Sequence, residues 1–313
     1  MSRLRISLFG RFRVEYDGST HTKSLESRKV QELFSYLLLY RDRLHPRESL
    51  ADFFWGENSS AQSRKYLRQA LWQLQSSLKT GDDSAEENAV LVDSDWVGIN
   101  KDFDIWLDVS DLENAYAKVK GKKGVEIEAG TARELAQAVD LHRGPLLEGW
   151  YNDWCIFERE RLQNIYLAML NKLMTYHEAS EEYEVGLLYG QRILRLDRAH
   201  ERTHWRMMRL YYLAGDRTSA LRQYKRCVDA LEEELGVKPA KWTMTLYEQL
   251  KSDQLEDAPS DARPSIEIGV APVGNINRLQ ALLNEFHNEL QLYVNASGSG
   301  LGERPKADLY PAE

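Results

Sequence analysis

The sequence predicts a mainly α-helical protein, in which a small module of helices and short strands precedes a domain of repeated helices. Two observations carry this prediction. In the first hundred residues, apolar side chains alternate over some short segments and recur at helical spacing over others. Residues 131–251 have a helical pattern with few prolines, and a weak 35-residue repeat relates Ala179 to Ala214 and Tyr189 to Tyr224. This period is close to that of tetratricopeptide repeats, in which each helical pair packs on its neighbour.

The N-terminal module reads as three helices packed by short strands. Its expected elements are strands at 4–8, 12–16 and 19–24, helices at 27–44, 47–55 and 60–79, and a hairpin at 90–99 with its turn at Asp93-Ser94-Asp95. Three small helices closed by a hairpin make a winged helix–turn–helix, which places its third helix in the major groove of DNA.

The charge is unevenly distributed along the 313 residues, whose net charge is −8. Residues 1–80 hold 14 Lys and Arg against 8 Asp and Glu, a net charge of +6, whereas the remainder holds 27 against 41, a net charge of −14. Such asymmetry indicates a basic module joined to an acidic one. The basic module can therefore bind nucleic acid although the whole chain is acidic.

The third helix carries the predicted DNA-binding face. Leu67, Leu71, Leu74 and Leu78 define its buried stripe, and the opposite face is basic and rich in glutamine. Arg and Lys neutralise phosphates, Arg pairs bidentately with guanine and Gln with adenine. Two cations at the start of the first helix, where the helix dipole favours phosphate, are added to this face. The predicted DNA-binding residues are Arg28, Lys29, Gln62, Arg64, Lys65, Arg68, Gln69, Trp72, Gln73 and Ser76. The alternative is a solvated basic face.

A second cationic stripe lies in the helical domain. Arg202, Arg206 and Arg209 recur at i, i+4 and i+7, which is the arrangement of a site for an anionic effector such as a nucleotide. The favoured alternative is a surface stripe paired with acids such as Glu201 and Asp197.

The sequence argues against several classes of function. The two cysteines are too few for a disulfide framework or a Cys-rich metal site, no stretch approaches 18 consecutive apolar residues, and the N-terminus lacks a signal-peptide pattern. No paired histidine spacing, phosphate loop or nucleophile elbow is present. We therefore expect a cytoplasmic protein without a membrane partner, metal or cofactor, and no enzymatic activity.

The C-terminal segment is expected to differ from the rest. Residues 252–275 read as a linker, 276–294 as an amphipathic helix with a heptad seam, and 295–313 as a disordered tail. The seam either pairs two subunits or folds back on its own domain.

Four collinear segments carry a resemblance to a known family. They are SRKYLRQALWQLQSSL (63–78), VLVDSDWVGINKDFDIWLDV (90–109), AVDLHRGPLLEGWYNDWCIFERERLQNIYLAML (138–170) and THWRMMRLYYLAGDRTSALRQYKRCVDALEEELGVKPAKWTMTLYEQL (203–250). In these segments the chain resembles the Streptomyces antibiotic regulatory protein family. The resemblance implies an OmpR-type winged-helix domain at 1–108 and a tetratricopeptide-like bacterial transcriptional activator domain at 109–251.

The resemblance also implies a function. Members of this family regulate transcription, usually as activators that bind direct repeats near a promoter as dimers and contact RNA polymerase. The GxxxxGK[ST] motif of the ATPase module found in larger members is missing from this chain, and the resemblance does not extend to 252–294. We therefore expect a DNA-binding transcriptional activator, with an anionic small molecule as a further partner. The alternative is a non-catalytic adaptor whose repeat domain binds other proteins.

Overall fold

The computed structural model describes residues 4–16, 25, 27–78 and 88–255, all of which lie in the first of two compact units, Met1–Ala258. The strand expected at 19–24 therefore lies outside the described residues. So do the predicted helix at 276–294, the tail at 295–313 and most of the expected linker.

A small sheet gathers segments that are distant in sequence. Strand β1 (Leu4–Ser7) pairs antiparallel with β2 (Arg13–Tyr16) and parallel with β6 (Ile105–Leu107). Gly10, with φ of 80°, lies in the turn between β1 and β2, and only glycine adopts that φ without strain. Asp108, at the end of β6, accepts hydrogen bonds from the backbone N–H groups of Leu8 and Phe9, each at 2.9 Å for Oδ2. The N-terminal strands are thereby fixed to the start of the helical domain.

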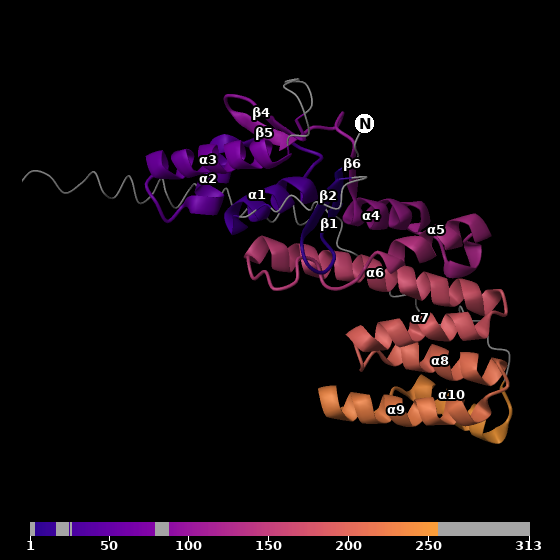
Figure 1. The fold of residues 1–313 in the computed structure, drawn as a ribbon. Coiled ribbons are helices and arrows are strands. Elements are labelled where there is room, and N and C mark those ends of the chain that lie inside the picture. Colours follow the sequence, from indigo (N-terminus) through magenta and orange to yellow (C-terminus); the bar gives the residue numbers. More distant parts are fainter. Residues whose placement is uncertain (1–3, 17–24, 26, 79–87, 256–313) are drawn as a thin grey trace, which may run out of the picture. The chain divides into compact units, whose positions relative to one another are not determined.

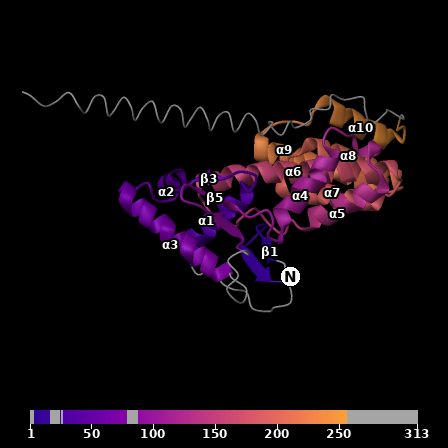
Figure 2. The ribbon, with the colours of Figure 1, turned by 90° about the horizontal axis from the view of Figure 1, so that it is seen from above.

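The winged helix–turn–helix follows the predicted order. Its helices are α1 (Arg28–Leu39), α2 (Arg47–Trp55) and α3 (Ser60–Leu78). Its second sheet has the order β3-β5-β4 and consists of β3 (His45–Pro46), β4 (Val90–Val92) and β5 (Trp96–Ile99). Figure 2 shows α3 running along the edge of this module, beside α1 and α2. The leucines of the predicted α3 stripe are buried, so its remaining face is turned away from the core.

The rest of the described chain is helical. Its elements are α4 (Asp108–Val119), the 3₁₀ helix η1 (Gly124–Glu126), α5 (Ala129–Asp140), α6 (Asp153–Ala179), α7 (Tyr183–Leu196), α8 (Glu201–Leu213), α9 (Arg217–Leu235) and α10 (Lys241–Ser252). In Figure 1, α6, α7, α8 and α9 lie side by side in sequence order. This stacking of successive antiparallel helices is the tetratricopeptide-like arrangement that the 35-residue repeat predicted. The fold is thus mainly α-helical, with a winged helix–turn–helix followed by helical repeats.

Close approach of the helices depends on small residues. Met174, Leu187, Met207 and Leu210 form one buried cluster between α6, α7 and α8. A Cβ at Gly190 would lie 2.7 Å from Cγ of Met207, so a glycine there lets α7 and α8 come together.

Several contacts join the winged helix to the helical domain. The carboxylate of Glu113 in α4 binds Arg41, which follows α1, and Arg161 in α6, both at 2.7 Å. The ring of Tyr36 in α1 meets that of Trp154 in α6 edge-on at 5.6 Å. These contacts explain why residues 1–258 form one compact unit.

Candidate nucleic-acid interface

The position of α3 is fixed by its first turn. Ser63 is buried, and its hydroxyl lies 2.8 Å from the carbonyl oxygen of Trp55 at the end of α2 and 3.2 Å from that of Ser59. The hydroxyl therefore ties the start of α3 to the end of α2. This bond sets the angle between the two helices of the helix–turn–helix.

The predicted face of α3 is open to solvent. Lys65, Arg68, Gln69 and Ser76 are exposed, and the Trp72 side chain is 68% exposed. Among the residues that the structure describes, neither Lys65 nor Arg68 has a hydrogen-bond or ion-pair partner. Gln73 is half-buried at the margin of this face. The structure thus brings together two unpaired cations, an amide and an exposed indole on one helix surface.

Two predicted residues on α3 already have protein partners. Arg64 pairs with Glu48 of α2 at 3.2 Å, and both side chains are more than half exposed. An exposed pair of this kind contributes roughly 0–1 kcal/mol, so Arg64 can exchange the carboxylate for a phosphate. The amide of Gln62 donates to the hydroxyl of Tyr66 at 2.8 Å.

The two cations on α1 have a different environment. Arg28 and Lys29 both pair with Glu32 at 3.2 Å, and the guanidinium of Arg28 lies 4.1 Å from the ring centroid of Trp150. Their partners therefore lie outside the α3 face, and Arg28 contacts an aromatic residue of the helical domain. Phosphate binding by this pair stays a prediction.

The hairpin formed by β4 and β5 has a structured turn. Asp93 accepts a hydrogen bond from the backbone N–H of Ser94 at 2.6 Å, so this carboxylate caps the turn. The guanidinium of Arg47 donates to the backbone carbonyl of Asp93 at 2.8 Å and thereby holds the hairpin against α2. Sequence analysis missed Arg47, because a lone arginine after a proline has no distinctive pattern.

The stripe on α8 is largely neutralised within the protein. Glu178 of α6 pairs with Arg209 at 2.8 Å and with Arg206 at 3.6 Å, and all three side chains are at most 15% exposed. Arg206 also donates to the hydroxyl of Thr175 at 2.7 Å, whereas Arg202 is exposed. The expected partner Glu201 instead accepts from the backbone N–H of Ala240. Anion binding by this stripe stays a prediction.

Metal-ligating clusters and cysteine reactivity bear on the chemistry open to the described residues. Within them there is no cluster of three His, Cys, Asp or Glu side chains that could hold a metal ion. Burial raises the pKa of the Cys155 and Cys227 thiols, that of Cys227 to about 12. Neither thiol is therefore activated as a nucleophile. Over the same described residues, no helix is long and apolar enough to cross a membrane.

Comparisons with known proteins agree with this architecture. Residues 107–251 match the bacterial transcriptional activator domain. A solved structure of Mycobacterium tuberculosis EmbR, in complex with a low-affinity phosphopeptide, superposes with a TM-score of 0.65 at 18% identity, covering 82% of this chain and 67% of that one. At this identity the likeness concerns the fold. No curated protein sequence matches the chain significantly.

The domain match and the fold describe the same helical region of the chain. The helical repeats are those of a transcriptional activator domain, and they follow a winged helix–turn–helix in the order predicted from four collinear segments. Residues 107–251 are thus similar to a bacterial transcriptional activator domain, and a winged helix–turn–helix precedes them, as the resemblance to the Streptomyces antibiotic regulatory protein family implied.

Proposed function

We propose that the protein is a transcriptional regulator that binds promoter DNA through the exposed face of α3. The observation that carries the proposal is the pair of unpaired cations, Lys65 and Arg68, beside Gln69 and Trp72 on a helix whose other face is buried. Cations without a protein partner lose no ion pair when they bind phosphate. The exposed ring of Trp72 suits a thymine methyl group or a sugar.

Phosphate contacts supply most of the affinity in this proposal. Arg64, Lys65 and Arg68 offer three cations on each protomer, and a dimer on a direct repeat offers about six. Each neutralised phosphate releases condensed counterions, so the slope of log K against log salt is expected to be about −5.

Base recognition falls to the polar side chains of the same face. Arg68 is of the residue type that binds guanine bidentately, and Gln69 of the type that binds adenine. Each correct bidentate contact discriminates against a wrong base by about 1–3 kcal/mol.

In this proposal the helical domain regulates the activity of the DNA-binding module. We infer that the protein acts in the cytoplasm as a homodimeric activator, that residues 109–251 dimerise and contact RNA polymerase, and that an anionic small molecule modulates DNA binding. Support comes from the activator-domain match at 107–251.

A second candidate, a protein-interaction adaptor, has one observation in its favour. Tyr151 and Phe157, near the start of α6, are 83% and 63% exposed. Exposed aromatic side chains of this kind are common at sites that bind another protein. The adaptor would not depend on α3.

A binding assay with mixed-sequence duplex DNA separates the two candidates. The triple variant Lys65→Ala, Arg68→Ala, Gln69→Ala is expected to bind at least tenfold more weakly and to lose about four units of the salt slope in a dimer. The matched control is Lys225→Ala, Arg222→Ala, Gln191→Ala, which removes exposed residues of the same types from the helical domain. Equal DNA binding by the triple variant and the wild type would contradict the proposed interface.

A further inference from the structure

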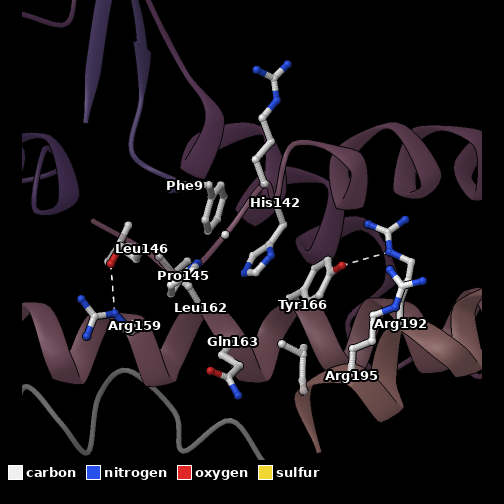
Figure 3. Close-up of a pocket in the computed structure, with 13 residues that line it drawn as sticks. Phe9, His142, Pro145, Leu146, Arg159, Leu162, Gln163, Tyr166, Arg192 and Arg195 are labelled. Carbon is white, nitrogen blue, oxygen red and sulfur yellow. Dashed lines mark hydrogen bonds between the residues drawn. The ribbon is translucent and has the colours of Figure 1, made fainter. Parts of the chain in front are cut away.

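A pocket of about 610 Å³ lies where the helical domain meets the N-terminal sheet. Its walls come from the loop after α5, from one face of α6 (Arg159, Leu162, Tyr166), from the end of α7 and from Phe9, which follows β1. In Figure 3, Phe9, His142 and Tyr166 lie between Arg159 on one side and Arg192 and Arg195 on the other. The volume is within the range of small-molecule sites, about 300–1,000 Å³.

Among the described residues that line the pocket, none is an acid and four are arginines: Arg143, Arg159, Arg192 and Arg195. Arg159 is held by the carbonyl oxygens of Leu146, Leu147 and Trp150, at 3.0, 3.2 and 2.9 Å. Carbonyl oxygens fix the guanidinium without removing its charge. The positive charge of Arg159 therefore remains available to a ligand in the pocket.

Arg192 is fixed in a similar way. It donates to the hydroxyl of Tyr166 at 3.0 Å and to the carbonyl oxygen of Val139 at 2.8 Å. Within the described part of the chain its carboxylate partner is Asp140 at 2.7 Å, whose side chain is 71% exposed. Because solvent screens such a pair, Asp140 offsets only part of the charge of Arg192.

The other two arginines that line the pocket have side chains without a protein partner among the described residues. Arg143 and Arg195 are exposed, and neither guanidinium has a hydrogen-bond or ion-pair partner among the described residues. They can therefore close on a bound anion without breaking a contact in the protein.

One wall of the pocket is aromatic. The rings of His142 and Tyr166 stack at 4.0 Å with an interplanar angle of 13°, and the ring of Phe9 lies 4.9 Å from that of His142. Burial, assisted by the charge of Arg192, lowers the pKa of His142 to about 4, so its ring is neutral near pH 7. A neutral aromatic and aliphatic wall beside fixed guanidinium groups suits a ligand with a ring and an anionic group.

We propose that this pocket is an effector site for a small aromatic organic anion, bearing either a phosphate or a carboxylate. Backbone hydrogen bonds connect the pocket directly to the DNA-binding module. The loop that lines it bonds to the N-terminal strands, through Gly10 N–H to the Pro145 carbonyl at 3.0 Å and Leu147 N–H to the Leu8 carbonyl at 2.8 Å. Occupancy would stabilise this junction and so change the affinity for DNA, a consequence that rests on the proposed function.

Ligand binding is measured on the full chain, by thermal shift and equilibrium dialysis, without DNA. The probes are adenosine 5′-monophosphate, salicylate, inorganic phosphate and adenosine. One aromatic anion is expected to raise the Tm in a saturable way, while phosphate and adenosine at the same concentration leave it unchanged. The phosphate-bearing and carboxylate-bearing probes distinguish the two kinds of anionic group.

A pair of variants locates the site. Arg143→Gln with Arg195→Gln removes only exposed, unpartnered side chains and is expected to weaken binding at least tenfold. The control, Arg222→Gln with Lys225→Gln on α9, is expected to bind as the wild type does. The proposal is overturned if neither aromatic anion binds, or if the Arg143/Arg195 variant binds as tightly as the wild type. Failure of the proposed function would appear instead as absence of DNA binding by the free protein, with ligand binding intact.

Discussion

At the scale of single residues, Glu178 is the carboxylate on which the packing of α8 against α6 depends. It pairs with Arg206 and Arg209, and the side chains of Glu178 and Arg206 are 9% and 10% exposed. Removing one member of a buried ion pair leaves the other charge without compensation, which costs about 3–5 kcal/mol.

The variant Glu178→Ala is therefore expected to lower the free energy of unfolding by about 3 kcal/mol, as measured by urea denaturation. The matched control is Glu233→Ala, because the pair between Arg198 and Glu233 is about 60% exposed on both sides. That variant should change stability by less than about 1 kcal/mol. Equal effects of the two variants would show that the buried ion pair contributes no more to stability than the exposed one.

His142 makes the stability of the folded protein depend on pH. Burial and the nearby Arg192 lower the pKa of this histidine from 6.5 to about 4 in the folded state. As the pH falls, this histidine is therefore protonated in the unfolded chain before it is protonated in the folded protein. The contribution of neutral His142 to stability is complete above pH 6.5 and is lost between pH 6.5 and about 4.

The variant His142→Gln should lack this contribution. The difference in unfolding free energy between wild type and variant is expected to shrink by about 3 kcal/mol on going from pH 7 to pH 4. Comparison with the variant is needed because burial also lowers the pKa of His45, His200 and His204. A difference that is constant over this range would refute the assignment to His142.

At the scale of elements, η1 packs tightly against α6. A Cβ built on Gly124 would lie 2.7 Å from the backbone carbonyl oxygen of Lys172, whereas one built on Gly130 in α5 would meet nothing within 4 Å. Backbone atoms of a long helix cannot move aside as a flexible side chain does. Substitution of these two glycines by alanine is therefore expected to change the stability in opposite directions.

The substitution Gly124→Ala is expected to destabilise the protein by about 1–3 kcal/mol. Gly130→Ala should stabilise it by up to about 1 kcal/mol, since it reduces the freedom of the unfolded chain within a helix. Thermal unfolding of the two variants checks both signs. Destabilisation by both would indicate that the space around α5 is also restricted.

Elements with a strong local pattern were predictable. The helix predicted at 47–55 coincides with α2, and the predicted hairpin at 90–99 corresponds to β4 and β5. Strands β3 and β6 were missed because each has two or three residues and is defined by a partner far away in the chain. The helix α4 was missed as well, within a stretch that the sequence left unassigned.

The same distinction applies to sites. The α3 face could be predicted because its residues share one helix and one periodicity. The buried state of Arg206 could not, because its partner Glu178 lies on another helix. The pocket brings together Phe9 and arginines spread from position 143 to 195, and no local pattern marks such a set.

At the scale of the whole molecule, the described chain joins the winged helix–turn–helix to the helical repeats. The contacts of Glu113 with Arg41 and Arg161, and the backbone bonds between the N-terminal strands and the pocket loop, join the two parts of the first compact unit. A change in the helical domain therefore has a physical path to the winged helix.

The most direct test of the central claim is selection of bound sequences from a random double-stranded DNA pool with the full chain at low salt. If α3 reads promoter DNA in a dimer, the full chain enriches one motif, repeated in direct orientation at a fixed spacing. The triple variant Lys65→Ala, Arg68→Ala, Gln69→Ala then loses this enrichment while the Lys225, Arg222, Gln191 control keeps it. Enrichment of the same motif by the α3 variant, or of no motif by the wild type, would show that α3 does not read DNA in this way.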